Sequence, residues 1–257
     1  MKRLSRVSFY RQTVEDKINP SPFFCLFSLI LHKYLTTGGT TLSTRIGLIS
    51  DVHATPEPVA EALARFKEQG VDRILCAGDI AGYGEHLERT VALLVEHDCQ
   101  AIQGNHELWY LDKHADEEDT PASRWFRYLP RVIQLTIEGK RLYMVHASPP
   151  DSYVDGIKLL DLDGNLIAEE KARWTERLQG FQHDVLLVGH THQVFCEQLG
   201  GTLVVNPGST RFNHTCAILS LPEMELKVFA LSGKQPVKFW NWGINQARAQ
   251  IKRVGDK

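Results

Sequence analysis

Five short apolar stretches of this chain each end in residues that are common metal ligands. The stretch Val185–Val188, for example, is followed by Gly189 and then by His190 and His192 in the sequence GHTH. In an extended chain, side chains two residues apart leave the same face, so this pair could bind one object at the end of a strand. An isolated pair of this kind is more often satisfied by ordinary hydrogen bonds. The other four stretches favour a shared function.

The polar groups at the five ends suit divalent metal ions. They are Asp51, His53, Asp79, Asn105, His106, His146, His190 and His192. Imidazole nitrogens combined with carboxylate and amide oxygens favour a transition metal. The groups are too many for one ion but suit two ions that share a carboxylate, and Asp79 is the candidate bridge. A close pair of ions can activate water and stabilise the attacking and leaving oxygens of phosphoryl displacement, so these residues indicate phosphoester chemistry.

Alternating elements must position these ligands. From Arg45 onward, apolar stretches that predict strands alternate with amphipathic stretches that predict helices. The predicted strands are residues 45–50, 72–78, 99–104, 140–145 and 184–188, and the predicted helices are residues 57–70, 85–97, 122–129 and 167–180. Neighbouring antiparallel strands are predicted at residues 201–206, 215–221 and 224–231. The pattern predicts an α/β domain with a partly parallel sheet, in which ligands bind beyond the carboxyl ends of the strands.

The ordered motifs DVH, GD, GNHE, VHAS and GHTH resemble those of the calcineurin-like metallophosphoesterase family. The resemblance extends over about residues 45–231. The sequence VVNPGSTR, residues 204–211, is similar to a segment of the small bacterial and archaeal phosphodiesterase branch. The resemblance implies a two-sheet β-sandwich flanked by helices, with four layers in the order α/β/β/α.

The resemblance also implies a role for each ligand. The first metal ion would bind Asp51, His53, Asp79 and His192, and the second would bind Asp79, Asn105, His146 and His190. His106 matches a position that does not bind metal and assists the leaving group, and Glu107 could orient His106. Manganese is the first expectation for both ions, and the ligands would also accept iron, zinc, cobalt or nickel.

The implied activity is hydrolysis of a phosphodiester, or of a pyrophosphate-linked nucleotide, by a metal-activated hydroxide. Ser/Thr protein phosphatases of this superfamily have an arginine just after the GD motif, whereas this chain has GDIAGYGEH at residues 78–86. A phosphomonoesterase or a protein-phosphatase-like enzyme is therefore the weaker alternative. A scaffold protein that has the same fold and a degraded site is the non-enzyme alternative, and the complete ligand set disfavours it.

The composition indicates which partners to expect. The chain has 29 Lys and Arg against 31 Asp and Glu residues, a formal net charge of -2, so we expect a small phosphoester substrate rather than nucleic acid or a membrane. Its 5 cysteines have no Cys-x-x-Cys spacing, which favours reduced thiols in a cytoplasmic protein. The sequence indicates no particular oligomeric state.

The two ends of the chain differ from its central part. Residues 1–44 are predicted to be an extension that is disordered or forms a short helix. Its apolar stretch, Phe23–Leu31, is too short to span a bilayer, which needs about 20 residues. Residues 45–231 would form the metallophosphoesterase domain, and residues 232–257 would form a C-terminal tail. We expect this tail to contain a solvated helix whose tryptophans are packed.

Overall fold

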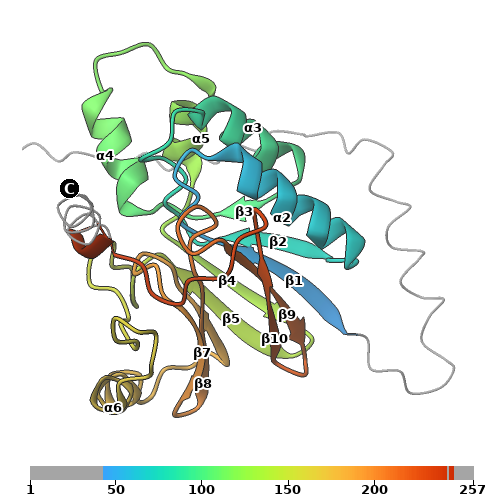
Figure 1. Ribbon diagram of the computed structural model, residues 1–257, viewed down its shortest axis with the longest axis vertical. Helices are drawn as coiled ribbons and strands as arrows, with labels where there is room; N and C mark the ends of the chain where they lie inside the picture. Colours follow the sequence, from blue (N-terminus) through green and yellow to red (C-terminus); the bar gives the residue numbers. More distant parts are fainter. Residues whose placement is uncertain (1–42, 242, 246–257) are drawn as a thin grey trace, which may run out of the picture. The chain divides into compact units, whose positions relative to one another are not determined.

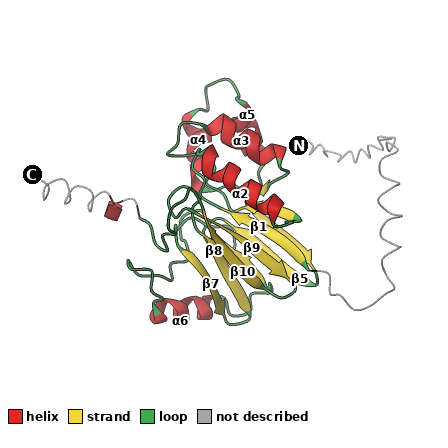
Figure 2. Cartoon of the chain, turned by 45° about the vertical axis from the view of Figure 1, so that its right-hand side comes forward, coloured by secondary structure: helices red, strands yellow, loops and turns green. Residues whose placement is uncertain are grey.

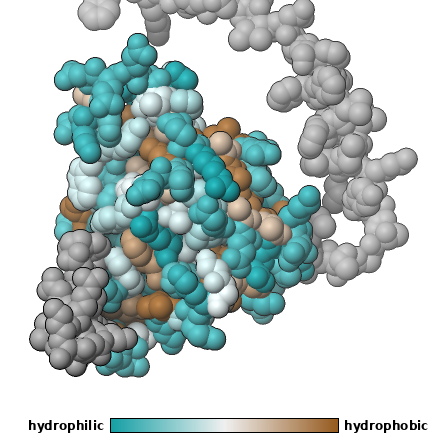
Figure 3. All heavy atoms as spheres, turned by 45° about the horizontal axis from the view of Figure 1, so that its top comes forward, coloured by the Kyte–Doolittle hydropathy of each residue, from teal (hydrophilic) through white to brown (hydrophobic). Residues whose placement is uncertain are grey.

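The computed structural model describes residues 43–241 and 243–245 of the chain. These residues form two five-stranded sheets with helices on both outer faces (Figure 1). The predicted extension at residues 1–44 lies almost entirely outside the described part, and the predicted tail lies partly outside it. In the described part, no helix is long and apolar enough to cross a membrane. The face shown in Figure 3 is mainly hydrophilic, with hydrophobic residues in small separate groups.

The first sheet has the strand order β10-β9-β1-β2-β3. Its strands are β1 Thr44–Ile49, β2 Arg73–Cys76, β3 Gln100–Ala101, β9 Thr215–Leu221 and β10 Glu225–Ala230. Strands β1, β2 and β3 run parallel, and β9 is antiparallel to β1 and β10. Its outer face packs against helices α2 (Pro56–Glu68), α3 (Leu87–Glu96) and α5 (Pro121–Tyr128). Helix α4 (Asn105–Lys113) directly follows β3.

The second sheet has the order β4-β5-β6-β8-β7. Its strands are β4 Val132–Ile137, β5 Lys140–Val145, β6 Val185–Leu187, β7 Val194–Leu199 and β8 Thr202–Pro207. Strands β5, β6 and β8 are parallel, whereas the edge strands β4 and β7 are antiparallel to their neighbours. Helix α6 (Ala168–Arg177) covers the outer face of this sheet, on the far side from α2 and α3 (Figure 2).

Alternation of side chains along the strands produces the layers. In β6, Val185 and Leu187 lie in the core between the sheets, whereas Leu186 lies in the core beneath α6. In β1, Leu48 lies between the sheets and Ile49 packs under the helices of the first sheet. Strands covered on both faces are apolar along their buried length, as β6 and residues 46–49 of β1 are. The predicted two-sheet α/β/β/α fold is confirmed.

The structure corrects three details of the predicted arrangement. Strand β8 pairs with β6 and β7 in the second sheet and not with β9, so the three late strands are not consecutive neighbours. Helix α4 was not predicted, because few of its residues are buried and its apolar periodicity is weak. The edge strands β4 and β7 were also not predicted, because most of their residues are only half-buried or exposed.

Candidate metal centre

The predicted ligands lie in the segments that follow five strands, at the edge where the two sheets meet. In the order β1, β2, β3, β5 and β6, these segments carry Asp51 and His53, Asp79, Asn105, His146, and His190 with His192. Parallel strands present their carboxyl ends at the same edge, which brings together residues far apart in sequence. Their side chains include three overlapping groups, in each of which the possible ligand atoms all lie within 4.8 Å of one another.

The first group consists of Asp51, His53 and His192. His53 Nε2 lies 3.1 Å from His192 Nε2, and His192 Nε2 lies 3.3 Å from Asp51 Oδ1. All three side chains are buried. With Asp79, they are the residues that the resemblance implies for the first metal ion.

The second group consists of Asp79, His146 and His190, with Asn105 beside it. His146 Nε2 lies 3.3 Å from Asp79 Oδ1 and 3.2 Å from Asn105 Oδ1. His190 Nδ1 lies 3.0 Å from the same amide oxygen. These four residues are the ones implied for the second metal ion, and Asp79 lies next to both groups.

Backbone carbonyls fix the rings of three histidines. In His53, His146 and His190, one ring nitrogen lies 3.0, 2.7 and 3.0 Å from a carbonyl oxygen. Those oxygens belong to Ala81, Ala77 and Val154, respectively. An N–H that donates there leaves the other nitrogen with a lone pair directed into the cluster, as in metal-bound histidines. His190 Nδ1 and Asn105 Oδ1 then face each other as two acceptors, an arrangement that a bound cation would satisfy.

The electrostatics of the centre also favour a cation. Burial raises the pKa of the Asp51 and Asp79 carboxyls, but the neighbouring histidines, chiefly His192 for Asp51 and His146 for Asp79, together lower both pKa values. Burial would lower the pKa of His146, but Asp79 raises it to about 9, whereas burial lowers the pKa of His53 to about 3. Within the described residues, the ion pairs of the two aspartates involve histidines and no lysine or arginine. Nitrogen and oxygen donors grouped around two buried carboxylates fit divalent metal ions.

His106 belongs to the third group, with His53 and Asp79. Its Nε2 lies 3.9 Å from Asp79 Oδ2, and its backbone N–H donates a hydrogen bond to Asp79 Oδ1. The side chain is 13% exposed, so the ring lies at the opening of the centre. Burial lowers the pKa of His106. The structure therefore places His106 beside the ligands, and its role as a non-ligand stays a prediction.

Five of the predicted ligands adopt a left-handed backbone conformation, with φ between 47° and 66°. They are Asp51, His53, Asp79, His190 and His192. Such conformations cost about 1–3 kcal/mol each and persist where the surrounding structure fixes them, typically at functional sites. Asp and His tolerate this region better than most residues. The loops therefore hold the side chains in one cluster at a conformational cost.

Glu107 has different contacts from those predicted. Its fully buried carboxylate accepts hydrogen bonds from the backbone N–H groups of Asp79, Ile80, Ala81 and Gly104, at 2.6–2.9 Å. Burial and the charge of Asp79 raise the pKa of Glu107 to about 7. In the described part of the chain, its hydrogen bonds go to these amides and none to the ring of His106. Glu107 is therefore placed to position the Asp79 loop rather than to orient His106.

Two glycines make room for the ligands themselves. A Cβ on Gly104 would lie 2.2 Å from Asp79 Oδ1, and one on Gly189 would lie 2.0 Å from Ser50 Oγ and 2.7 Å from Asp51 Oδ2. Any larger residue would displace these carboxylates. The GNHE and GHTH motifs therefore begin with glycine because ligand side chains from other loops pack closely against Gly104 and Gly189.

The end of β8 and the connection that follows it hold the main chain of the ligand loops. Asn206 Nδ2 donates to the Gly189 carbonyl, Ser209 Oγ donates to the Asp51 carbonyl, and Asn213 Nδ2 donates to the His192 carbonyl. These side chains are fully buried. Two of these residues, Asn206 and Ser209, belong to the sequence VVNPGSTR, so this segment stabilises the main chain of the ligand loops.

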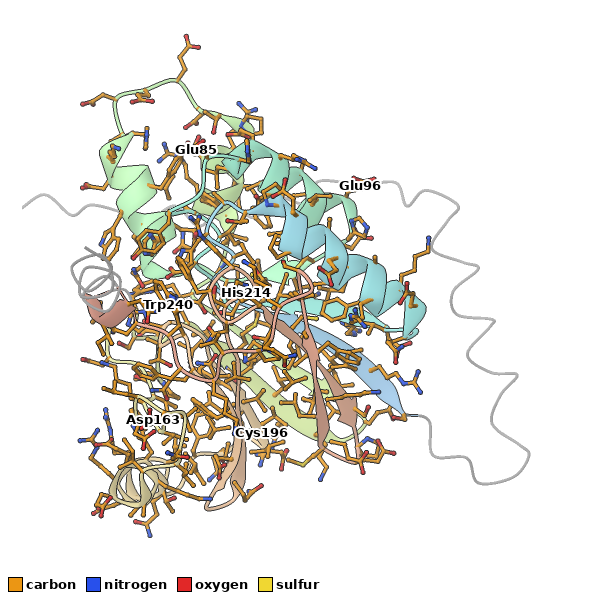
Figure 4. All side chains as sticks on the ribbon, in the orientation of Figure 1. Glu85, Glu96, Asp163, Cys196, His214 and Trp240 are labelled. Atoms are coloured by element: carbon orange, nitrogen blue, oxygen red, sulfur yellow. The ribbon has the colours of Figure 1, made fainter. Side chains whose placement is uncertain are left out.

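Three aromatic residues at the centre were missed by the sequence analysis. Tyr83 and Phe212 have ring centroids 4.8 and 5.4 Å from that of His53. Trp240, labelled in Figure 4, stacks on Phe212 with 3.8 Å between centroids and lies 5.3 Å from the ring of His192. Its backbone N–H donates to the His192 carbonyl. The sequence gives no sign that Trp240 lies near the histidines. The contact forms because Phe239 pairs with Gln193, the residue just before β7.

We expect Glu107→Gln to lower the free energy of unfolding by about 2 kcal/mol. The amide nitrogen of Gln would replace one carboxylate oxygen and face two backbone N–H groups as a donor. Urea unfolding of the metal-free protein measures the loss, and Glu118→Gln, at an exposed position, is the control. Equal stability of both variants would show that these four hydrogen bonds do not stabilise the loop.

Comparisons with known proteins agree with this geometry. The calcineurin-like phosphoesterase superfamily domain matches residues 44–223, more than half of the chain. An uncharacterized protein of Methanocaldococcus jannaschii is 26% identical over 194 residues, which cover 65% of this chain and 70% of the relative. A probable metallophosphoesterase of Methanothermobacter thermautotrophicus is 30% identical over 171 residues, which cover 64% of this chain and 76% of the relative. The crystal structure of a metallophosphoesterase from Sphaerobacter thermophilus has a similar fold, with a TM-score of 0.53 at 20% identity over 82% of this chain and 95% of that chain. The chain therefore belongs to the calcineurin-like phosphoesterase superfamily.

Proposed function

We propose that the protein is a hydrolase of phosphodiesters, or of pyrophosphate-linked nucleotides, that uses two divalent metal ions. The observation that carries the proposal is the set of histidine nitrogens that backbone carbonyls direct toward buried carboxylates. Ions held there would activate water and stabilise charge on the phosphoryl oxygens. Manganese is the proposed metal, and the donors also suit iron, zinc, cobalt or nickel. A small phosphoester as partner and a cytoplasmic location are parts of the same proposal.

The chain's own groups divide the work between binding and proton transfer. Asp79 lies next to both groups of ligands and is the proposed bridge. His106 lies at the opening, where its ring can donate a proton to the leaving-group oxygen or a hydrogen bond to the phosphoryl group. Glu107 holds the loop that carries Asp79.

The distribution of arginines favours diesters over monoesters. A monoester dianion benefits from guanidinium groups, which bind phosphate oxygens in pairs. Arg124 and Arg127 hydrogen-bond to Asp119 at α5, so they are occupied elsewhere. Of Arg124, Arg127 and Arg211, only Arg211 contacts a residue of the centre, and it does so through the His53 carbonyl. A diester carries a single charge and makes better use of an acid such as His106.

The strained ligand loops disfavour the scaffold alternative. A protein that used this fold only for docking would gain nothing from five ligands in left-handed conformations. The phosphomonoesterase and protein-phosphatase alternatives need more positive charge near the centre than the described arginines supply. Hydrolysis of a diester is therefore the activity to test first.

We expect the reconstituted protein to bind close to two divalent ions per chain and to hydrolyse bis(p-nitrophenyl) phosphate. Asp79→Asn should remove most of this activity and lower the metal content, because one carboxylate serves both groups of ligands. Elemental analysis and the release of nitrophenol measure the two effects. Asp163→Asn, at an exposed position, is the control. One ion or none in the reconstituted wild type would refute the proposed centre.

We expect His106→Ala to keep the metal content of the wild type while lowering kcat by about 10²-fold, the usual effect of removing one proton donor. Elemental analysis and steady-state kinetics with the same diester provide the test. His97→Ala, at an exposed position in the described chain, is the control. Parallel loss of metal and activity would identify His106 as a ligand.

We expect kcat/KM to be higher for a nitrophenyl diester than for the matched nitrophenyl monoester in Mn²⁺, because few guanidinium groups lie near the centre. Steady-state kinetics with both substrates under the same conditions gives the comparison. A monoester advantage of about tenfold, equivalent to about 1.4 kcal/mol of transition-state binding, would favour the monoesterase alternative instead.

A further inference from the structure

A cleft of about 520 Å³ opens next to the metal centre. Its walls come from the loops after β1 and β2, from the β8–β9 connection and from the turn after β10; they include Thr55, Tyr83, His86, Arg211, Phe212 and Lys234. Because Tyr83 and Phe212 also contact the ring of His53, the cleft adjoins the ligand cluster. None of the residues that line the cleft has been given a role in the proposed hydrolysis.

Arg211 is held in the cleft by neutral acceptors. Its Nη1 donates to the His53 carbonyl at 3.0 Å and to Thr55 Oγ1 at 3.1 Å, and the guanidinium lies over the Phe212 ring, 5.1 Å from its centroid. Within the described residues, it forms no ion pair, and its other guanidinium nitrogens have no hydrogen-bond partner. A fixed, half-buried guanidinium with unused N–H groups suits two oxygens of a phosphate.

Besides Arg211, the charged side chains that line the cleft are one lysine and one glutamate. Lys234 lines it together with His86 and His214, and Glu85 is its one acidic lining residue (Figure 4 labels Glu85 and His214). The chain as a whole has a formal net charge of -2, whereas this cleft has two basic side chains, Arg211 and Lys234, against one acidic side chain. A local excess of positive charge attracts anions.

Two exposed aromatic rings lie beside His106, at the opening of the metal centre. Tyr83 is 47% exposed and lies 4.9 Å from His106 between ring centroids. Trp109 is 59% exposed and lies 4.8 Å from the same ring. Exposed aromatic faces next to basic side chains are a common platform for nucleobases. The substrate that would use both features contains an aromatic base and more than one phosphate.

We propose that this cleft binds the non-reacting phosphate of a pyrophosphate-linked nucleotide, with Arg211 as its anchor. The proposal rests on the proposed function and narrows it from diesters in general to phosphoanhydrides. Arg211 contacts the main chain of His53, whereas the ligand atoms are on its ring, so the anchored phosphate lies beside the reacting one. Hydrolysis would join the water oxygen to the reacting phosphorus and break the bridging P–O bond. One proton of the water goes to the departing phosphate, which Arg211 holds, and the other goes to solvent.

The test compares wild type and Arg211→Gln with two substrates in Mn²⁺. For diadenosine diphosphate, we expect KM to rise about tenfold or more with little change in kcat, the loss of one charged hydrogen-bonded contact. For bis(p-nitrophenyl) phosphate, which has one phosphate, the change should be much smaller. Calorimetric titration with the methylene-bridged analogue of ADP, which is not hydrolysed at its bridge, should show a Kd raised by the same factor.

Two further variants complete the experiment. Arg124→Gln removes an exposed arginine of α5 that hydrogen-bonds to the Asp119 carbonyl, and it should leave both KM and Kd unchanged. Lys234→Gln should raise the KM for diadenosine diphosphate by about threefold, and it keeps the proposal testable if Arg211→Gln does not fold.

The outcomes separate this proposal from the proposed function. Equal losses on both substrates would show that Arg211 acts through the His53 main chain, and an unchanged Kd for the ADP analogue would show that the cleft does not bind phosphate; either result overturns the proposal. If wild type hydrolyses neither substrate, the proposed function fails, and the Kd values of the variants still decide whether the cleft binds a nucleotide.

Discussion

Burial of two carboxylates is the constraint on which this structure depends. Asp51 and Asp79 lie at the junction of two sheets, where removing a charge from water is costly unless a partner compensates it. Within the described residues their ion-pair partners are histidines, and burial disfavours the charged form of His146, one of these rings. Divalent cations resolve this conflict, because they leave the carboxylates charged and the imidazoles neutral. The fold supplies the geometry, and the metal would supply the charge balance.

The cost of holding this geometry is spread over the loops. Left-handed conformations at Asp51 and His190, for example, are fixed from both sides: the Asp51 carboxylate accepts a hydrogen bond from the His190 backbone N–H, and Ser209 bonds to the Asp51 carbonyl. Glu107 does the same for the loop after β2 by accepting four backbone N–H groups. Buried groups that fix the main chain are therefore part of the site, because they hold the ligands in position. The apolar strands behind them provide the stability that offsets this strain.

The surroundings of the centre come from parts of the chain that carry no ligand. Phe212 lies in the connection between β8 and β9, and Trp240, which comes after β10, stacks on it. Arg211 contacts the main chain of a ligand residue and belongs to a different wall of the cleft from Tyr83. Metal chemistry is thus built at the strand ends, whereas the groups that could select a substrate come from the later connections. This division explains how a shared metal centre could serve different substrates within one superfamily.

The sequence by itself determined the fold class and the set of chemical groups at the strand ends, because apolar runs followed by Asp, Asn and His are local patterns. It predicted α2, α3, α5 and α6, whose periodicity is strong, and it missed β4 and β7, whose residues are mostly half-buried. Only the tertiary structure decided that β8 joins the second sheet, that Glu107 turns away from His106 toward backbone amides, and that Trp240 packs beside His192. These contacts join residues far apart in the chain, and hydrogen bonding and packing between separate loops leave no periodic signal in the sequence.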